Sequence, residues 1–325
     1  MKKVRLAAAA IVLAGVGIAA FLVLHRGQSD QVLGEWAAIG GRRWLLPNLD
    51  DAEIVLIDRP HTKQEAPQAR RGLATIQRTR SYFLSTNADR LRNAPIGPKA
   101  QGTWRIVAIG DSVTHGWGIE EPKTWVRLLE GELRAKGRNV EVINAGVPSA
   151  DADLMSAWCL AEGPRFEVDE VLWARRPAGP GGVDRYATLS HDCAAKLHAR
   201  LTVVLSPIST FDPHGSAVYR QEASEVRTKV GPQVDVIELT DVVRAAQAGR
   251  GEVLEHRGGK AAVVDQETGK TWLEAPWSDG DLDPSIYALF EAHPDVREAL
   301  FLDEGHPDEE GAAIIAKAVA DRLRP

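Results

Sequence analysis

The sequence predicts an α/β fold in which a parallel β-sheet is covered by helices on both faces. Short apolar runs alternate with helix patterns from residue 104 onward, and strands that alternate with helices imply a parallel sheet. The composition, 44% hydrophobic and 26% charged, is that of a globular protein. The length of 325 residues suits one large domain with an additional segment.

Five strands and five helices are predicted in this regular part. The strands are short apolar runs at 105–109, 140–143, 171–174, 201–205 and 234–239. In the first helix one face carries the apolar residues Trp125, Leu128, Leu129 and Leu133, and the pattern ends at Gly137. The other helices are predicted at 151–161, 186–200, 216–229 and 308–323.

Residues 1–26 are predicted to be a membrane anchor or a signal peptide. The uncharged run 6–24 follows three basic residues, and at about 1.5 Å per residue it matches the ~30 Å hydrocarbon core of a bilayer. The positive-inside rule then places the N-terminus inside and the remaining chain outside. This predicts a single-pass protein of the cytoplasmic membrane with a periplasmic or otherwise extracytoplasmic domain. The alternative is a cleaved signal peptide and a secreted protein.

Residues 27–100 are predicted to be a juxtamembrane linker that partly packs on the main domain. Strand-like runs occur at 53–57 and 82–85, and the prolines and glycine of 94–99 mark its end. The main domain is then 101–325.

An insertion at about 253–300 interrupts the main domain. Within it, residues 261–265 and 270–273 are predicted to form a hairpin. Because the insertion directly precedes the last helix, we expect it near the carboxyl edge of the sheet, where open α/β sheets bind ligands.

Charge and cysteine content exclude several classes of protein. The 39 basic and 45 acidic residues give a formal charge of −6, so no nucleic-acid partner is predicted. Two cysteines exclude a disulfide framework and a Cys-rich zinc module. The nine histidines form no zinc motif.

The strongest local motif is Gly110-Asp111-Ser112, between the first strand and a helix pattern. A serine on such a turn has an exposed hydroxyl, and its backbone N–H points toward a ligand, as at helix N-termini. Turns also favour Gly, Asp and Ser for structural reasons alone. The motif therefore indicates catalysis only if a second catalytic motif occurs elsewhere in the chain.

Asp303 and His306 stand three residues apart just before the last helix. The carboxylate can reach one imidazole nitrogen and leave the other to take a proton, as a Ser-His-Asp triad requires. Acidic residues also favour a helix N-terminus, which explains Asp303 but not His306. The pair is therefore a candidate base and orienting acid.

Together these motifs resemble the SGNH/GDSL hydrolase superfamily, over roughly 104–325. The resemblance implies a flavodoxin-like three-layer α/β/α domain with a five-stranded parallel sheet. It implies that Ser112 is the nucleophile, His306 the general base and Asp303 its orienting partner, with Asp111 in a supporting role. No metal or organic cofactor is implied.

The same resemblance implies an oxyanion hole formed by the backbone N–H groups of Ser112 and Gly146. The sequence departs from the family at a third donor, an asparagine side chain expected after the third strand, because no Asn follows Asn144. Loss of one such donor costs on the order of 10²–10³ in rate. Either Arg175 or Arg176 replaces it, or the site is slow, or it no longer catalyses.

The family fold also places Cys159 and Cys193 in helices on one face of the sheet. A disulfide and two separate buried thiols are both consistent with this placement, since bridging needs Cα atoms within about 7 Å. An exported domain would meet an oxidising environment.

The predicted function is a serine carboxylester hydrolase with an acyl-serine intermediate, acting on an acyl ester such as an acetylated envelope or exported glycan. One alternative is an O-acyltransferase that uses the same serine, and another is a catalytically impaired glycan-binding or assembly protein. In a third, the motifs are coincidental, and Ser112 and His306 lie more than about 5 Å apart.

Overall fold

The computed structural model describes the main domain and parts of the segments around it. The described residues are 32–56, 80–177, 182–207, 213–248, 252–257, 260–265, 271–278, 281–282, 300 and 306–324. The predicted membrane segment 6–24 and Asp303 lie outside them. Among the described residues, no helix has both the length and the apolar character needed to cross a bilayer.

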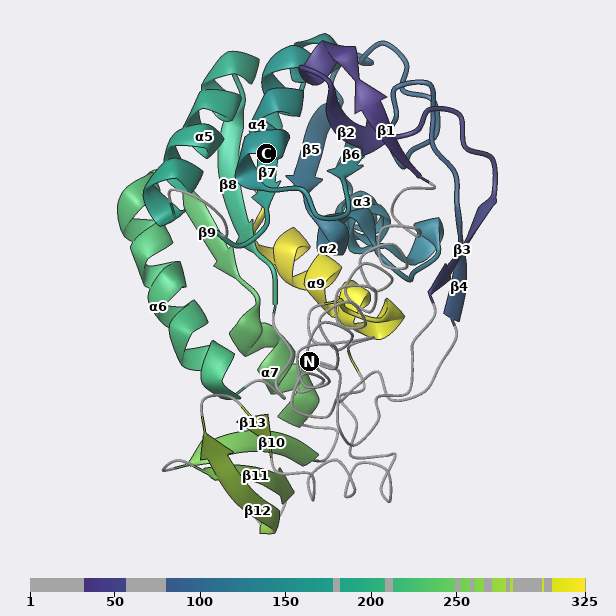
Figure 1. The fold of residues 1–325 in the computed structure, drawn as a ribbon. Helices are drawn as coiled ribbons and strands as arrows, with labels where there is room; N and C mark the ends of the chain where they lie inside the picture. The colour runs from purple at the N-terminus through teal and green to yellow at the C-terminus, as the bar shows by residue number, and fades with distance from the viewer. Residues whose placement is uncertain are drawn as a thin grey trace, which may run out of the picture.

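A five-stranded parallel sheet forms the centre of the molecule (Figure 1). Its strands are β5 (Trp104–Gly110), β6 (Val140–Gly146), β7 (Glu170–Ala174), β8 (Arg200–Leu205) and β9 (Asp235–Glu238). The spatial order β6-β5-β7-β8-β9 puts the first of these strands between the second and the third. This is a doubly wound order, and it confirms the predicted fold class and all five predicted strands.

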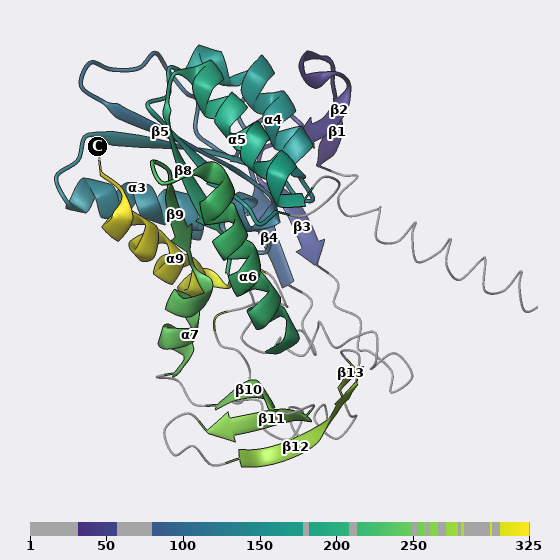
Figure 2. The same ribbon diagram turned by 90° about the vertical axis from the view of Figure 1, so that its left-hand side faces the viewer.

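Helices cover both faces of the sheet (Figures 1 and 2). Alternate residues of β5 point to opposite faces: Val107 and Ile109 join one apolar cluster, and Ile106 and Ala108 join the other. The first cluster includes α4 (Ala152–Ala161), α5 (Gly182–Leu197) and α6 (Pro213–Val230), and the second includes α3 (Trp125–Ala135) and α9 (Glu309–Arg322). These are the five predicted helices.

Helix α7 (Thr240–Ala248) and the antiparallel pair β1 (Leu33–Trp36) and β2 (Arg42–Leu45) were not predicted. Strands β3 (Ala52–Leu56) and β4 (Arg80–Leu84) confirm the two predicted N-terminal strands and form a second antiparallel pair.

The N-terminal segment packs into the main core. The Trp44 and Trp158 rings are stacked with centroids 5.7 Å apart. The Asn144 backbone N–H donates to Asn93 Oδ1 over 2.7 Å, so the segment also covers the open edge of β6. An uncovered edge strand would present unpaired backbone groups to other chains.

The insertion contains a four-stranded antiparallel sheet. Its strands, in spatial and chain order, are β10 (Glu252–Arg257), β11 (Lys260–Asp265), β12 (Thr271–Ser278) and β13 (Asp281–Leu282). The predicted hairpin is confirmed by the pairing of β11 with β12.

Cys159 and Cys193 form a disulfide between α4 and α5, with Cα atoms 5.7 Å apart. Both side chains are fully buried. Of the two arrangements that the sequence allowed, the structure therefore has the crosslink rather than two separate thiols.

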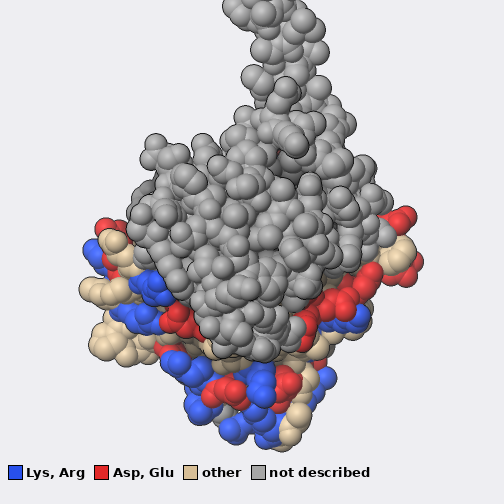
Figure 3. Space-filling model, turned by 90° about the horizontal axis from the view of Figure 1, so that it is seen from below, with Lys and Arg blue, Asp and Glu red and all other residues tan. Residues whose placement is uncertain are grey.

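Acidic and basic side chains are interspersed on the described part of the face in Figure 3. Ion pairs join elements far apart in the sequence: Lys123 pairs with Glu309 over 2.6 Å, and Arg322 pairs with Asp235 over 2.9 Å. The first pair links α9 to the loop that precedes α3.

Candidate active site

The short helix α2 (Ser112–His115) follows β5 at the carboxyl edge of the sheet. The Asp111 side chain caps it by accepting the Val113 backbone N–H over 3.0 Å. A Cβ at Gly110 would lie 2.1 Å from Thr114 Oγ1, so only glycine leaves room for that hydroxyl. Thr114 Oγ1 in turn donates to the Ala174 carbonyl over 2.9 Å, which ties α2 to the end of β7.

His306 lies two residues before Asp308, the N-cap residue of α9. Asp308 caps α9, because its Oδ1 accepts the backbone N–H groups of Glu310 and Gly311 over 3.0 and 2.8 Å. The Asp308 backbone N–H donates to the Leu300 carbonyl over 2.9 Å. These bonds set the direction in which the chain enters the helix.

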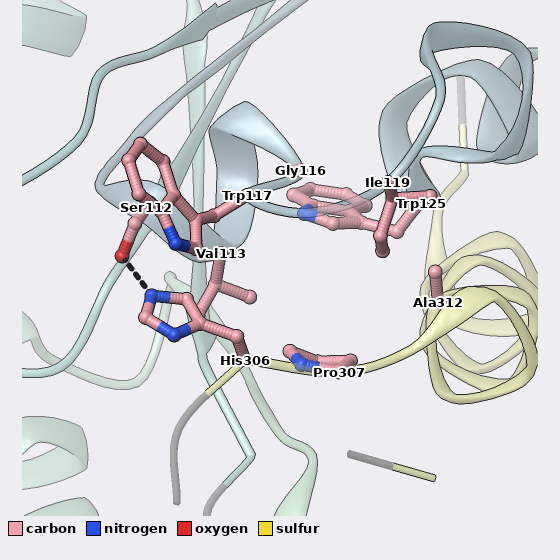
Figure 4. A pocket seen from close by; sticks show the side chains of 9 residues that line it. All are labelled: Ser112, Val113, Gly116, Trp117, Ile119, Trp125, His306, Pro307 and Ala312. Carbon is pink, nitrogen blue, oxygen red and sulfur yellow. Dashed lines mark hydrogen bonds between the residues drawn. The ribbon is translucent and has the colours of Figure 1, made fainter. Parts of the chain in front are cut away.

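The structure brings Ser112 and His306 together (Figure 4). Ser112 Oγ and His306 Nε2 are 2.7 Å apart, and both residues are half-buried. This distance excludes the alternative in which the two motifs are unrelated in space. A serine hydroxyl bonded to an imidazole is the arrangement in which the ring can remove the hydroxyl proton.

An apolar wall lies beside this pair. The Trp117 ring centroid is 6.4 Å from that of His306 and 6.0 Å from that of Tyr82. A small pocket here has no room for a water molecule. The described residues that line it are Ser112, Val113, Gly116, Trp117, Ile119, Trp125, His306, Pro307 and Ala312 (Figure 4). This wall shields one side of the imidazole from solvent.

Gly146 does not have the arrangement expected of an oxyanion donor. Its backbone N–H donates to Asn144 Oδ1 over 2.9 Å, and a Cβ there would lie 2.1 Å from the His115 nitrogen. Gly146 therefore allows α2 to approach β6 closely. The Ser112 backbone N–H, by contrast, makes no hydrogen bond within the described part of the chain.

Ser149 is a candidate donor that sequence reasoning missed. The Ala150 N–H donates to the Val147 carbonyl over 3.1 Å, which closes a turn with Pro148 and Ser149 at its centre. Ser149 has φ +61°, a left-handed conformation that is costly for a residue other than glycine and often occurs at functional sites. Its N–H makes no hydrogen bond to any described residue. The Pro-Ser pair directly after a strand was the available signal.

Ser149 and Ser112 lie on loops at the same edge of the sheet. Gly110 and Gly146 are paired in register at the ends of β5 and β6, and the Val147 N–H donates to the Gly110 carbonyl over 3.0 Å. The two loops therefore start side by side.

The two candidate arginines have different surroundings. Arg176 is buried, and its guanidinium donates to the Ser206 carbonyl, Glu238 and Thr240 over 2.5–2.7 Å. Burial raises the pKa of its further partner Glu222, and the Arg176 charge partly offsets that rise. These bonds tie β7 to β8 and β9, which is a structural role.

Arg175 instead lies beside the nucleophile turn. Its Nε is 3.5 Å from Asp111 Oδ2, and its side chain is 13% exposed. Of the two arginines, Arg175 is thus the one next to the residue that precedes Ser112.

Comparison with known proteins gives structural neighbours only. No protein-family model and no curated protein matches the sequence. A member of the lipolytic protein G-D-S-L family from Veillonella parvula is 13% identical over 67% of this chain and 97% of its own, with a TM-score of 0.37. An acetyl xylan esterase is 14% identical over 68% of this chain and 100% of its own, with a TM-score of 0.38.

A two-domain esterase active on acetylated mannans is 13% identical over 67% of this chain and 48% of its own, with a TM-score of 0.42. The solved structures similar to this chain include a protein whose own description names the lipolytic G-D-S-L family. At these identities and TM-scores the similarity assigns neither a family nor an activity to this chain.

Proposed function

We propose that the chain is a serine carboxylester hydrolase that acts through an acyl-serine intermediate. The observation that carries the proposal is the 2.7 Å contact between Ser112 Oγ and His306 Nε2 at the carboxyl edge of the sheet. Ligands bind at this edge in doubly wound folds. The apolar wall around Trp117 supports the proposal, because a shielded imidazole interacts more strongly with its bonding partner.

In the proposed reaction, His306 accepts the Ser112 proton as Oγ attacks the ester carbonyl. The imidazolium then gives the proton to the leaving alcohol, and an acyl-serine remains. Water attacks this ester with His306 again as the base, which releases the acid and restores the serine. Asp303, three residues before His306, is the proposed orienting acid, as the sequence motif predicts.

We assign the oxyanion donors to the backbone N–H groups of Ser112 and Ser149, with Arg175 in place of the missing asparagine. Both amides lack another hydrogen-bond partner among the described residues. A guanidinium next to Asp111 can stabilise a developing oxyanion or bind an anionic group of the substrate.

The proposed substrate is an acetylated glycan of the cell envelope or an exported one, and the proposed location is extracytoplasmic, with residues 6–24 as anchor or signal. The disulfide supports the location, because disulfides persist mainly in oxidising compartments.

The test is hydrolysis of 4-nitrophenyl acetate and of acetylated oligosaccharides by the full chain in detergent. We expect turnover by the parent protein, and loss of at least about 10³-fold in Ser112→Ala. Arg175→Met should lower kcat by about 10²-fold, as loss of an oxyanion donor does. Arg185→Met, which removes an exposed ion pair with Asp153, is the matched control and should keep full activity. A folded parent without turnover on either substrate class would refute the proposal.

A second candidate is a glycan-binding or assembly protein that keeps the fold. Two observations favour it: Gly146 uses its N–H internally, and Arg176 is held in a structural cluster. It predicts glycan binding that is unchanged by Ser112→Ala. An O-acyltransferase would instead transfer the acetyl group to added sugar faster than to water.

A further inference from the structure

Arg92 is a fully buried cation that is bonded mainly to the loop after the nucleophile helix. Its Nη1 donates to the carbonyl oxygens of His115 and Gly116 over 2.9 and 2.8 Å. Its Nη2 donates to the Ile119 carbonyl over 2.6 Å. One guanidinium thus fixes three carbonyls within five residues of chain, a geometry that suits its planar fork of donors.

The Arg92 guanidinium lies beside the Tyr82 ring and contacts no carboxylate of a described residue. Among the described residues no carboxylate lies within ion-pair distance of it, and its guanidinium lies 5.2 Å from the centre of the Tyr82 ring. Burial lowers the pKa of Arg92, and the nearby Glu120 and Glu121 partly offset that effect. An unpaired buried charge is expensive, and an apolar side chain would fill a structural position at lower cost.

The loop that Arg92 holds is hydrogen-bonded to the nucleophile itself. The backbone N–H groups of Gly116 and Trp117 both donate to the Ser112 carbonyl over 3.0 Å. The Trp117 ring in turn lies beside that of His306, with 6.4 Å between centroids. Gly116 and Trp117 therefore connect Arg92 to both members of the candidate pair.

We propose that Arg92 is a positioning residue for the Ser112–His306 pair. It acts by fixing the loop Gly116–Ile119, so that the serine carbonyl and the Trp117 ring stay in place. The inference rests on the proposed function for its kinetic consequence. It assigns a role in the site to the segment that follows β4, outside the part of the chain that carries the motifs.

Arg105 provides a matched control. It is also a buried arginine, 2% exposed, and it donates to the carbonyls of Phe166 and Gly97 over 2.8 and 2.9 Å. It differs in pairing with Glu141 and in lying at the start of β5, at the edge of the sheet opposite to Ser112. Arg105→Met therefore measures how much the loss of a buried arginine lowers stability when the candidate site is left unchanged.

The test compares Arg92→Met and Arg105→Met in the full chain, each assayed below its own unfolding temperature. We expect Arg92→Met to lower kcat for 4-nitrophenyl acetate by at least about tenfold with KM within about twofold, because small displacements of reacting groups are costly. Millimolar guanidinium should restore part of the rate. Arg105→Met should unfold at a lower temperature yet keep kcat within about twofold.

A second readout does not depend on turnover. The imidazole ¹H–¹³C NMR signal of His306, assigned with His306→Ala, should shift in Arg92→Met and stay in place in Arg105→Met. If Arg92→Met does not fold, Arg92→Lys, which keeps the charge but lacks the fork, is measured in its place. An unmoved His306 signal or an equal loss of kcat in both variants would overturn the inference. A parent without turnover would refute only the proposed function, and the NMR signal would still decide the role of Arg92.

Discussion

His306 Nε2 lies 2.7 Å from Ser112 Oγ although 194 residues separate the two in the chain. The contact follows from the packing of α9 on the same sheet face as α3, which brings the start of α9 to the end of β5. If this contact serves catalysis, His306→Gln should lower kcat/KM for 4-nitrophenyl acetate by at least about 10³-fold without lowering the unfolding temperature.

The matched control is His191→Gln. His191 lies on α5, away from the candidate site, and contacts the Val230 carbonyl at the end of α6, so it should be dispensable for hydrolysis. A loss below tenfold in His306→Gln would mean that another group removes the serine proton.

Gly116 should be intolerant of any side chain. It ends α2 with φ +81°, and a Cβ there would lie 2.3 Å from Thr124 Cγ2. We expect Gly116→Ala to lower the free energy of unfolding by about 1–3 kcal/mol, measured by urea denaturation.

Gly131→Ala is the control, because Gly131 lies within α3 with nothing near the added methyl group. That change should raise the free energy of unfolding by up to about 1 kcal/mol. The same change in the free energy of unfolding in both variants, or no decrease in Gly116→Ala, would contradict the local geometry.

His115 should make stability depend on pH. It is fully buried, and burial, followed by the Arg92 charge, holds its pKa well below the usual range. The unfolded chain therefore binds a proton below about pH 6.5 that the folded chain does not, so stability present at pH 7 is lost as the pH falls.

This loss should grow as the pH falls from 6.5 to 5 in the parent and be absent in His115→Leu, as read from urea denaturation at each pH. A parent and a His115→Leu variant with parallel pH profiles would show that His115 takes up its proton in the folded state.

The disulfide should contribute substantially to stability. Cys159 and Cys193 are 34 residues apart, and closing a loop of that size is worth about 2–4 kcal/mol. The double variant Cys159→Ala/Cys193→Ala should therefore unfold at a lower denaturant concentration than the oxidised parent, and added reductant should not change the midpoint of the variant. An identical midpoint for the oxidised parent and the double variant would contradict this.

Much of the fold was accessible from the sequence because its strands are short apolar runs that the sheet buries on both faces. The five central strands and the five helices packed on them were predicted in this way. The pair of strands β1 and β2 was not predicted. Strand β2 begins with the exposed Arg42 and Arg43, and only its last two residues are buried. Here the stacking of Trp44 on Trp158, a long-range contact, outweighs local polarity.

The candidate site was predictable only where a motif marks it. Ser112 and His306 carry local signals, a turn after a strand and a loop before a helix. The hydrogen bond from Gly146 to Asn144 has no such signal, since it depends on how closely α2 approaches β6. Arg92 stands in an irregular segment, and nothing in its neighbours indicates that three of its four carbonyl partners lie more than twenty residues further on.

The measurement that tests the central claim most directly is covalent labelling of Ser112. The full chain in detergent is treated with a fluorophosphonate, which reacts with activated serines, and the adduct is read by intact mass beside Ser112→Ala and Ser149→Ala. The account predicts one adduct on the parent and on Ser149→Ala, and none on Ser112→Ala. A folded parent that takes up no label, or a Ser112→Ala variant that still does, would contradict it.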